Sequence, residues 1–403
     1  MINVLHVIDS LGVGGTERQL ALTLNALDPQ RVKSYVCYFH PPDETALWIE
    51  EMGYPVYLLN APGKSQWFGA VRQLRGLVKT LDIDLIHTQL FDADMVGGIV
   101  GRLTGVPVVS TLANSVYDPE WLVDNPKLNR LKLAFPRTAR KYMARHLDRH
   151  VVAVSDSVKQ GALQNMGIAE DKVTVIHRAL FPSWLQDDID GEETPSAVDI
   201  DPSLGDRYPI ILNIGRLMPP KGQRYLIGAM PRILEKYPNA VLMIAGDGGL
   251  RRSLAAKADG LGVVNQMKFL GTRGDVKELL KICDVFAFPS LYEGCPNALL
   301  EAMSMGVPCV ASDIAPVREV TKDGRLATLV PIRDPDGIAD GICNTLANME
   351  SAKIMARMAS DTVRREFTIE KVASKLTRIY EECLGITAEV ESHQNQYQKS
   401  PTK

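Results

Sequence analysis

The chain has 403 residues, of which 45% are hydrophobic and 23% are charged, and its formal net charge is −3. This length exceeds what one hydrophobic core organises, so we expect two domains. The balanced charge argues against a protein that coats nucleic acid, and any basic contact surface must therefore be local. Six cysteines without a CxxC pair indicate reduced thiols and exclude a disulfide framework or a zinc site.

The first residues, MINVLHVIDSLGVGG, lack the basic region and long apolar stretch of a targeting signal. No later segment stays apolar over the roughly 18 residues that a membrane-spanning helix needs. We therefore expect a cytoplasmic protein without a signal or a span.

Short β-rich apolar runs alternate with longer amphipathic segments along the whole chain. This rhythm is typical of βα units around parallel sheets, and both halves of the chain are predicted to be doubly wound. The predicted strands of the first half are 4–8, 35–39, 56–59, 85–87, 106–110, 151–154 and 173–176. Those of the second half are 210–214, 240–245, 267–270, 285–288, 309–311 and 327–330.

A glycine-rich turn, DSLGVGGTERQL, follows the first predicted strand. Gly14 and Gly15 open a helix whose free amides could face a phosphate. A dinucleotide-binding fold would need an acidic residue at the end of the next strand, but that strand ends in His40. A Walker loop would need Gly-Lys-Ser/Thr, but Thr16 and Glu17 follow the glycines. The sequence therefore fits neither motif, and a tight turn without a ligand is the alternative.

Two Asp-x-Asp pairs in the sequence have the residue types of a metal site. Asp82 and Asp84 precede their strand and so lie at the wrong end of it. Asp92 and Asp94 follow a strand but fit the N-cap and first turn of a helix over 94–103 better. No metal site is therefore expected.

The segment 127–149, KLNRLKLAFPRTARKYMARHLDR, holds eight Lys or Arg and a single Asp. Its basic and apolar residues alternate in a way that favours an interfacial segment on an anionic membrane surface. A solvated helix face that pairs with carboxylates elsewhere is the alternative. Reversing the charges of Arg137, Arg140 and Lys141 would separate the two hypotheses.

The second half opens with ILNIGRLMPPKGQ, a strand followed by Gly215, Arg216, two prolines and Lys221 at the start of a helix. Ligands bind at this end of the strands in open parallel sheets. An arginine fork and a mobile lysine could neutralise a diphosphate without a metal, although two solvated loop cations are the alternative.

The stretch LYEGCPNALLEAMSMGVPCVAS places Glu293 and Glu301 eight positions apart. Pro296 suits a first helical position, which predicts a helix over 296–305 that ends before Gly306. The N-terminus of this helix would point into the crevice beside Arg216. The two carboxylates then fit hydroxyls at both ends of a nucleotide sugar, one at the hexose and one at the ribose.

GRLMPPKG, FPSLYEGCPNALLEAMSMGVPCVAS and GVGGTERQL together resemble the retaining glycosyltransferases of GT-B fold, which include bacterial mannosyl- and glucosyltransferases of polysaccharide and glycolipid synthesis. The resemblance covers nearly the whole chain. It implies an α/β fold of two doubly wound Rossmann-like domains that face a central cleft. The implied boundaries are an acceptor-side domain over 1–180, an acidic linker over 181–207, a donor-binding domain over 208–366, a helix over 367–386 that crosses back, and a disordered tail over 387–403.

The resemblance also implies roles for particular residues. Arg216 and Lys221 would hold the donor diphosphate, with Glu301 on the ribose hydroxyls. Glu293 and the backbone of the loop after it would hold the sugar, and these loop residues are Gly294, Cys295, Pro296 and Asn297. Gly14 and Gly15 would approach the donor phosphates from the other domain. Arg216, Lys221 and Glu293 are thus the catalytic candidates, and no metal or cofactor is implied.

Three departures from the family pattern fall on the N-terminal side of the cleft. A frequent histidine is replaced by Ala113, with Asn114 after it; the common His-x-His begins at His87 but ends in Gln89; and the usual Asn-Gly begins with Arg178. His87 and Asn114 are the acceptor-side candidates, and a histidine that only satisfies the backbone is the alternative for His87.

We therefore expect a metal-independent retaining enzyme that moves a hexose from a UDP- or GDP-sugar to a saccharide or polyprenyl-linked acceptor in cell-surface polysaccharide or glycolipid synthesis. The departing diphosphate would be stabilised by Arg216, Lys221 and the helix dipole, and would itself take the acceptor proton. The expected place of action is the cytoplasm, peripherally at the inner membrane face. The alternatives are a non-catalytic nucleotide-sugar-binding subunit and a sugar phosphorylase or nucleotide-sugar epimerase on the same fold.

Overall fold

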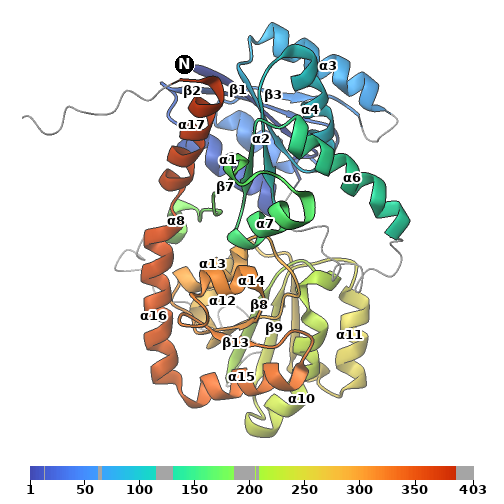
Figure 1. The fold of residues 1–403 in the computed structure, drawn as a ribbon. Helices are drawn as coiled ribbons and strands as arrows, with labels where there is room; N and C mark the ends of the chain where they lie inside the picture. Colours follow the sequence, from blue (N-terminus) through green and yellow to red (C-terminus); the bar gives the residue numbers. More distant parts are fainter. Residues whose placement is uncertain (13, 62–65, 115–129, 186–204, 206–207, 387–403) are drawn as a thin grey trace, which may run out of the picture.

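The computed structural model describes residues 1–12, 14–61, 66–114, 130–185, 205 and 208–386. Most of the predicted linker over 181–207, the predicted tail over 387–403 and residues 127–129 of the basic segment lie outside these residues. Two parallel sheets with helices on both faces lie one above the other (Figure 1). The predicted fold class, α/β with two doubly wound sheets, is confirmed.

The N-terminal sheet has seven strands in the order β3-β2-β1-β4-β5-β6-β7. Its strands β2, β1 and β4 are parallel and largely buried, because helices cover both faces. The elements of this domain are β1 (Ile2–Ile8), α1 (Gly15–Ala26), β2 (Val32–Tyr38), α2 (Glu44–Glu51), β3 (Val56–Leu58), α3 (Trp67–Thr80), β4 (Leu85–Gln89), α4 (Phe91–Thr104), β5 (Val108–Leu112), α6 (Arg130–His146), β6 (His150–Ala153), α7 (Asp156–Gly161) and β7 (Val173–Val175).

The C-terminal sheet has six strands in the order β10-β9-β8-β11-β12-β13. This order reverses direction at β8, and such switch points create the ligand-binding crevice of doubly wound sheets. The elements are α8 (Pro182–Leu185), β8 (Ile210–Ile214), α10 (Gln223–Lys236), β9 (Val241–Ala245), α11 (Arg251–Gly260), β10 (Met267–Gly271), α12 (Val276–Ile282), β11 (Val285–Phe288), α13 (Asn297–Ser304), β12 (Cys309–Ser312), α14 (Ala315–Val320), β13 (Thr328–Val330), α15 (Pro335–Ala347), α16 (Met349–Glu366) and α17 (Ile369–Leu384).

Every predicted strand is present, with ends that differ by at most three residues. The strand predicted over 106–110 is β5, which starts later, at Val108. Pro107 explains the shift, because proline has no amide to donate to a neighbouring strand. Only its carbonyl takes part, accepting a hydrogen bond from the Ile86 amide.

Two predicted helix starts are wrong. Helix α13 begins at Asn297, and Pro296 is its N-cap rather than its first residue. Helix α4 begins at Phe91, so Asp92 is not an N-cap and both aspartates lie in the first turn. Asp9 at the end of β1 explains the earlier start, because its Oδ1 accepts a hydrogen bond from the Ala93 amide at 2.8 Å.

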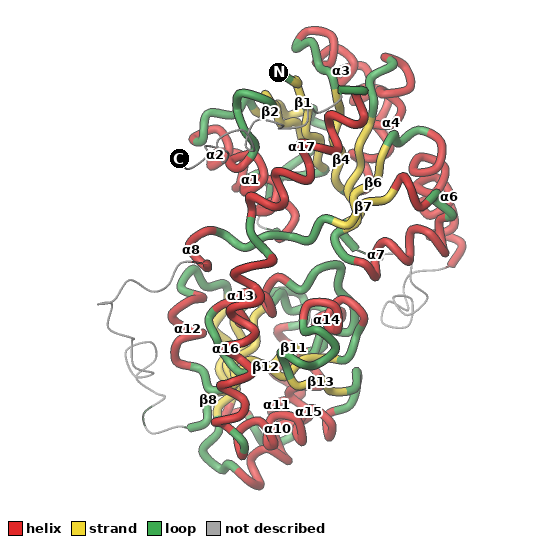
Figure 2. Tube along the Cα trace, turned by 60° about the vertical axis from the view of Figure 1, so that its left-hand side comes forward, coloured by secondary structure: helices red, strands yellow, loops and turns green. Residues whose placement is uncertain are grey.

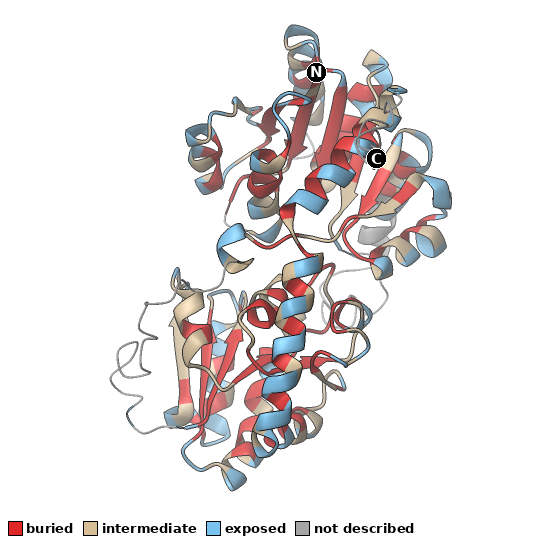
Figure 3. Ribbon diagram, turned by 90° about the vertical axis from the view of Figure 1, so that its left-hand side faces the viewer, coloured by how far each residue is buried: buried red, intermediate tan, exposed pale blue. Residues whose placement is uncertain are grey.

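The chain crosses between the two domains twice. After β7 it runs down to α8, and after α16 it returns through Phe367 to α17, whose exposed outer face and buried inner face are clear in Figure 3. The crossings lie side by side, since the Leu180 amide donates to the Phe367 carbonyl at 3.1 Å. Helix α17 packs Leu376, Ile379 and Tyr380 against the N-terminal domain next to α1. The tube in Figure 2 shows α16 and α13 side by side in the lower domain.

No helix within the described part of the chain is both long enough and apolar enough to cross a bilayer.

Candidate active site

Two loops of the C-terminal domain meet at the ends of its central strands. One follows β8 and carries Lys221; the other follows β11 and carries Glu293. The Leu291 amide donates to the Pro220 carbonyl at 2.8 Å, which joins the loops. Gly222 makes this approach possible: it has φ +65°, and a Cβ there would lie 1.9 Å from the Pro289 carbonyl oxygen.

The joined loops bring two of the predicted catalytic residues into contact. Lys221 Nζ lies 2.6 Å from Glu293 Oε1, in an ion pair that is partly open to solvent. Arg216 lies five residues before Lys221 in the same loop, and it is exposed. One of the cations predicted for a diphosphate therefore contacts the carboxylate predicted for a sugar.

Glu301 lies in the second turn of α13, behind Glu293 and deeper in the structure. Burial raises the pKa of Glu301 to about 7, and the positive charge of Arg18 on α1 of the other domain opposes this shift. A carboxyl group in this state gains most from a ligand that supplies hydroxyl donors. The placement agrees with a contact to sugar hydroxyls, and the ribose role stays a prediction.

The two domains approach each other closely at two glycines of the predicted donor site, Gly294 and Gly15. A Cβ on Gly294 would lie 1.9 Å from the Ala113 carbonyl oxygen and 2.9 Å from the Asn114 Cα. A Cβ on Gly15 would lie 2.9 Å from Arg178 Nη1 and 3.3 Å from Asn297 Nδ2, and one on Gly14 would meet the Glu17 carboxylate. Predicted donor-side and acceptor-side residues are therefore neighbours, with the exposed Asn114 beside the Glu293 loop.

Arg178 lies at this site, although the sequence predicted no role for it and showed only that it replaces the usual Asn-Gly. It follows β7, and its Nη2 donates to Thr16 Oγ1 at 2.8 Å at the start of α1. Burial lowers the pKa of Arg178, and the nearby Cys295, Glu293 and Glu17 oppose that effect. Burial also raises the pKa of the Cys295 thiol to about 11, so this residue is a packed neutral thiol. The only sequence signal for Arg178 was the unusual residue at its position.

His87, an acceptor-side candidate, uses both ring nitrogens within the fold, and its role as an acceptor contact stays a prediction. Its ring is buried, with Nδ1 2.6 Å from the Tyr380 hydroxyl and Nε2 2.8 Å from Thr111 Oγ1. Burial lowers the pKa of His87 to about 4. Both ring nitrogens are thus used inside the fold, and by side chains rather than by the backbone. His87 and Gln89 border a small cavity of about 50 Å³ between the sheet and α17.

Arg140 corrects part of the proposed membrane-facing segment. Its side chain is buried under α6, with Nε 2.7 Å from Asp94 Oδ2 and Nη1 3.0 Å from Asp148 Oδ2. Ser110 Oγ completes the cluster, donating to Asp148 and accepting from Arg140. This residue therefore pairs with carboxylates, as the alternative hypothesis expects, whereas Arg137, Arg145 and Arg149 are exposed.

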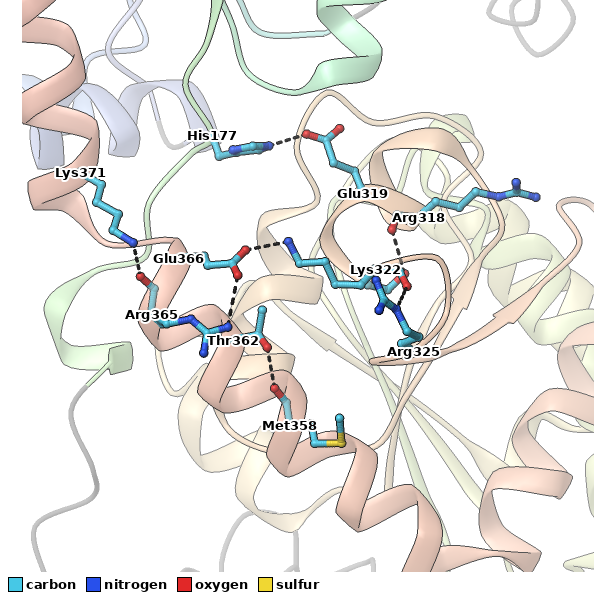
Figure 4. Close-up of polar contacts among 11 residues, drawn as sticks. His177, Arg318, Glu319, Lys322, Arg325, Met358, Thr362, Arg365, Glu366 and Lys371 are labelled. Atoms are coloured by element: carbon cyan, nitrogen blue, oxygen red, sulfur yellow. Dashed lines mark hydrogen bonds and ion pairs between the residues drawn. The ribbon is translucent and has the colours of Figure 1, made fainter.

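A second interdomain contact lies at the back of the molecule, beside a hollow of about 700 Å³. His177 from the first crossing contacts Glu319 on α14 of the lower domain, as Figure 4 shows. Asp156, His177 and Glu319 offer ligand atoms within 4.8 Å of one another, which a divalent cation could bridge. Both oxygens of Glu319 already accept from the Asp156 amide, at 2.9 and 3.0 Å, so we interpret the group as an ion pair that caps α7.

Known proteins resemble both halves of the chain. The family model described as Glycosyltransferase Family 4 matches residues 13–182, and the one described as Glycosyl transferases group 1 matches residues 208–348. An uncharacterised glycosyltransferase of Methanocaldococcus jannaschii is 33% identical over 246 residues, which are 60% of this chain and 62% of that relative. The aligned part is thus less than two thirds of that relative's length.

Two further comparisons cover more of the molecule. The UDP-Gal:alpha-D-GlcNAc-diphosphoundecaprenol alpha-1,3-galactosyltransferase of Escherichia coli is 26% identical over 318 residues, which are 75% of this chain and 76% of that enzyme. The crystal structure of Anabaena Alr3699/HepE in complex with UDP-glucose has a TM-score of 0.79 at 20% identity and covers 95% of this chain and 100% of that one. Since both halves match glycosyltransferase models and the two sheets share the GT-B arrangement, the chain belongs to the group 1 glycosyltransferases.

Proposed function

We propose that this glycosyltransferase moves a hexose from a UDP- or GDP-sugar, bound by the C-terminal domain, to a saccharide or polyprenyl-linked acceptor. The observation that carries the proposal is the pairing of Lys221 with Glu293 where two strand-end loops meet the N-terminus of α13. Two similar proteins support it. One relative acts from UDP-Gal on a diphosphoundecaprenol-linked sugar, and one similar structure holds UDP-glucose.

In this proposal the departing nucleoside diphosphate is stabilised without a metal or cofactor. Lys221 and Arg216 supply full positive charges, and the free amides at the start of α13 supply partial ones. Glu293 exchanges its contact with Lys221 for hydroxyls of the hexose when the donor binds. The acceptor hydroxyl then loses its proton to the leaving phosphate on the same face of the sugar, so that the configuration is retained.

Glu301 is proposed to accept hydrogen bonds from the ribose hydroxyls. Such bonds favour the ionised carboxylate and would lower its pKa from about 7. Donor binding should therefore release a proton near neutral pH and become tighter as the pH rises through 7. A Glu301→Gln variant should bind the donor more weakly and lose this pH dependence.

The membrane surface also enters the proposal. The exposed Arg137 and Arg145 of α6, with Arg149 just after it, would meet anionic lipid at the cytoplasmic face, where a lipid-linked acceptor is presented. Arg140 takes no part, because it is buried.

The experiment that tests the function combines donor binding with turnover. UDP-, GDP- and ADP-sugars are screened by thermal shift without divalent metal, since a ligand of the folded state raises its melting temperature. Sugar transfer or donor hydrolysis is then measured for Lys221→Ala, with Arg252→Ala on the exposed face of α11 as the control. We expect a loss of about 10²- to 10³-fold in kcat for Lys221→Ala alone. An unchanged kcat, or no stabilisation by any donor, would contradict the proposal.

One alternative is favoured by a specific observation, namely the buried His87 on the acceptor side. A non-catalytic nucleotide-sugar-binding subunit would show donor stabilisation in the thermal shift, yet no transfer or hydrolysis.

A further inference from the structure

Arg178 is a cation whose charge is poorly satisfied within the described residues. Its side chain makes one hydrogen bond, to the neutral hydroxyl of Thr16 at 2.8 Å, and no described carboxylate lies within 4.0 Å of its guanidinium. Burial lowers its pKa, which means that the surrounding protein disfavours the charged form. A guanidinium carries five donors in a planar fork, so most of its binding capacity is unused here.

The two carboxylates that act on Arg178 do not pair with it. Glu293 is held by Lys221 at 2.6 Å, and the Glu17 carboxylate lies beside Gly14 at the start of α1. Both carboxylates act on Arg178 from a distance, but neither forms an ion pair with it. An anion that pairs with Arg178 would therefore come from outside the described chain.

Two helix N-termini point to the same place. Arg178 Nη1 and Asn297 Nδ2 lie 2.9 and 3.3 Å from the position of a Cβ on Gly15. Gly15 begins α1 and Asn297 begins α13, so the positive ends of a helix from each domain meet beside the guanidinium. Their N-cap residues, Gly14 and Pro296, make no side-chain cap hydrogen bond.

We infer that Arg178 binds an oxyanion of the substrate between the starts of α1 and α13, either a phosphate of the donor or the carboxylate of an acidic hexose. The inference rests on the proposed function, which supplies the identity of the donor. It adds to the site a cation that comes from the N-terminal domain. Because the anion would contact both domains, its binding would also hold the cleft closed.

A purely structural role predicts something different. If Arg178 served only to link β7 to α1 through Thr16, Arg178→Gln would lower the stability of the fold, and anion binding would not change. The useful variants are therefore Arg178→Gln, which removes the charge, and Arg178→Lys, which keeps it. Arg252→Gln on the exposed surface of α11 is the matched control. Thermal unfolding without ligand checks that each variant is folded.

The experiment is isothermal titration of these variants with pyrophosphate, UDP-glucose, GDP-mannose and UDP-glucuronate. For a donor phosphate, Arg178→Gln should weaken pyrophosphate and the preferred neutral donor by about 10- to 100-fold, as expected for a lost charged hydrogen bond. For a hexose carboxylate, only UDP-glucuronate should weaken to that extent. Arg178→Lys should fall between Gln and the wild type, and Arg252→Gln should bind like the wild type.

The outcomes separate this inference from the proposed function. Binding to Arg178→Gln within twofold of the wild type for every ligand overturns the inference and leaves the function intact. If the wild type binds no nucleotide sugar but binds pyrophosphate through Arg178, the function fails and the anion site stands. If the wild type binds none of the four, both are overturned.

Discussion

The two walls of the cleft use charged residues in opposite ways. On the C-terminal wall, Arg216 is exposed and the Lys221–Glu293 pair is partly open to solvent, so these groups can exchange their partners for a ligand. In the N-terminal domain, His87 and Arg140 are buried and bonded to other side chains. His87 is the middle residue of β4 and Arg140 lies on α6, whereas Arg216 and Lys221 follow the end of β8. The two sets differ in the availability of their hydrogen-bonding groups as well as in their place on the strands.

The largest expected effect is on the stability of the N-terminal domain. Replacing Arg140 by alanine leaves the buried carboxylates of Asp94 and Asp148 without their shared cation. Breaking a buried pair in this way costs about 3–5 kcal/mol of the free energy of unfolding. Urea denaturation followed by circular dichroism measures it. Arg137→Ala, on the exposed face of the same helix, should stay within about 0.5 kcal/mol of the wild type.

If Arg140→Ala lowered the free energy of unfolding as little as Arg137→Ala, the buried cluster would contribute no more than an exposed residue. That result would contradict the stated difference between the two regions. Asp94 offers a further check. Burial raises its pKa to about 7 despite Arg140, so removing the arginine should raise it further. Part of the loss should then be recovered at lower pH, where Asp94 is protonated.

The second expected effect is on the pH dependence of stability, and it arises from the buried His6 and His87. The rings of His6 and His87 lie 5.6 Å apart, and burial lowers the pKa of both. The unfolded chain takes up protons near pH 6.5, whereas folded His87 does so only near 4, so stability falls as the pH drops from 6.5 to 4. His87 alone should account for about 3 kcal/mol of this fall. The free energy of unfolding at pH 4, 5, 6 and 7 measures it.

His87→Gln should flatten that pH dependence, since the side chain no longer takes up a proton. His146→Gln, at an exposed position on α6, should leave the slope unchanged. If His87→Gln kept the full slope while retaining a folded structure, the view of His87 as a residue locked inside the fold would be wrong.

Local sequence signals predicted the parts of the molecule that depend on local physics. The strands are short apolar runs, and both helices that open the site follow Gly or Pro, so the alternation alone gave the two sheets and placed Lys221 beside Glu293 at one edge. The features that the sequence did not predict depend on contacts between residues far apart in the chain. The hydrogen bond from His87 to Tyr380 joins residues 293 positions apart, and the early start of α4 depends on Asp9, which follows β1. No periodicity in the sequence encodes such partners.

The smallest expected effect is on the contact between the domains, where His177 meets Glu319. Burial acts to raise the pKa of Glu319, but hydrogen bonds from His177 and the Asp156 amide outweigh it and lower the pKa. The stabilisation is therefore present above the ordinary value of 4.5 and is lost as the pH falls below it. Glu319→Gln should cost about 1 kcal/mol at pH 7, as expected for a partly exposed pair.

A double-mutant cycle with His177→Gln isolates the pair, and a coupling energy of about 0.5–1 kcal/mol is expected. Glu366→Gln, which removes the Lys322 partner on the same hollow, is the matched control and should show no coupling to His177. Additive effects of the His177 and Glu319 changes would mean that the contact does not hold the domains together. The link between the domains would then rest on the Gly294 and Gly15 approaches, where a ligand in the cleft would act directly on closure.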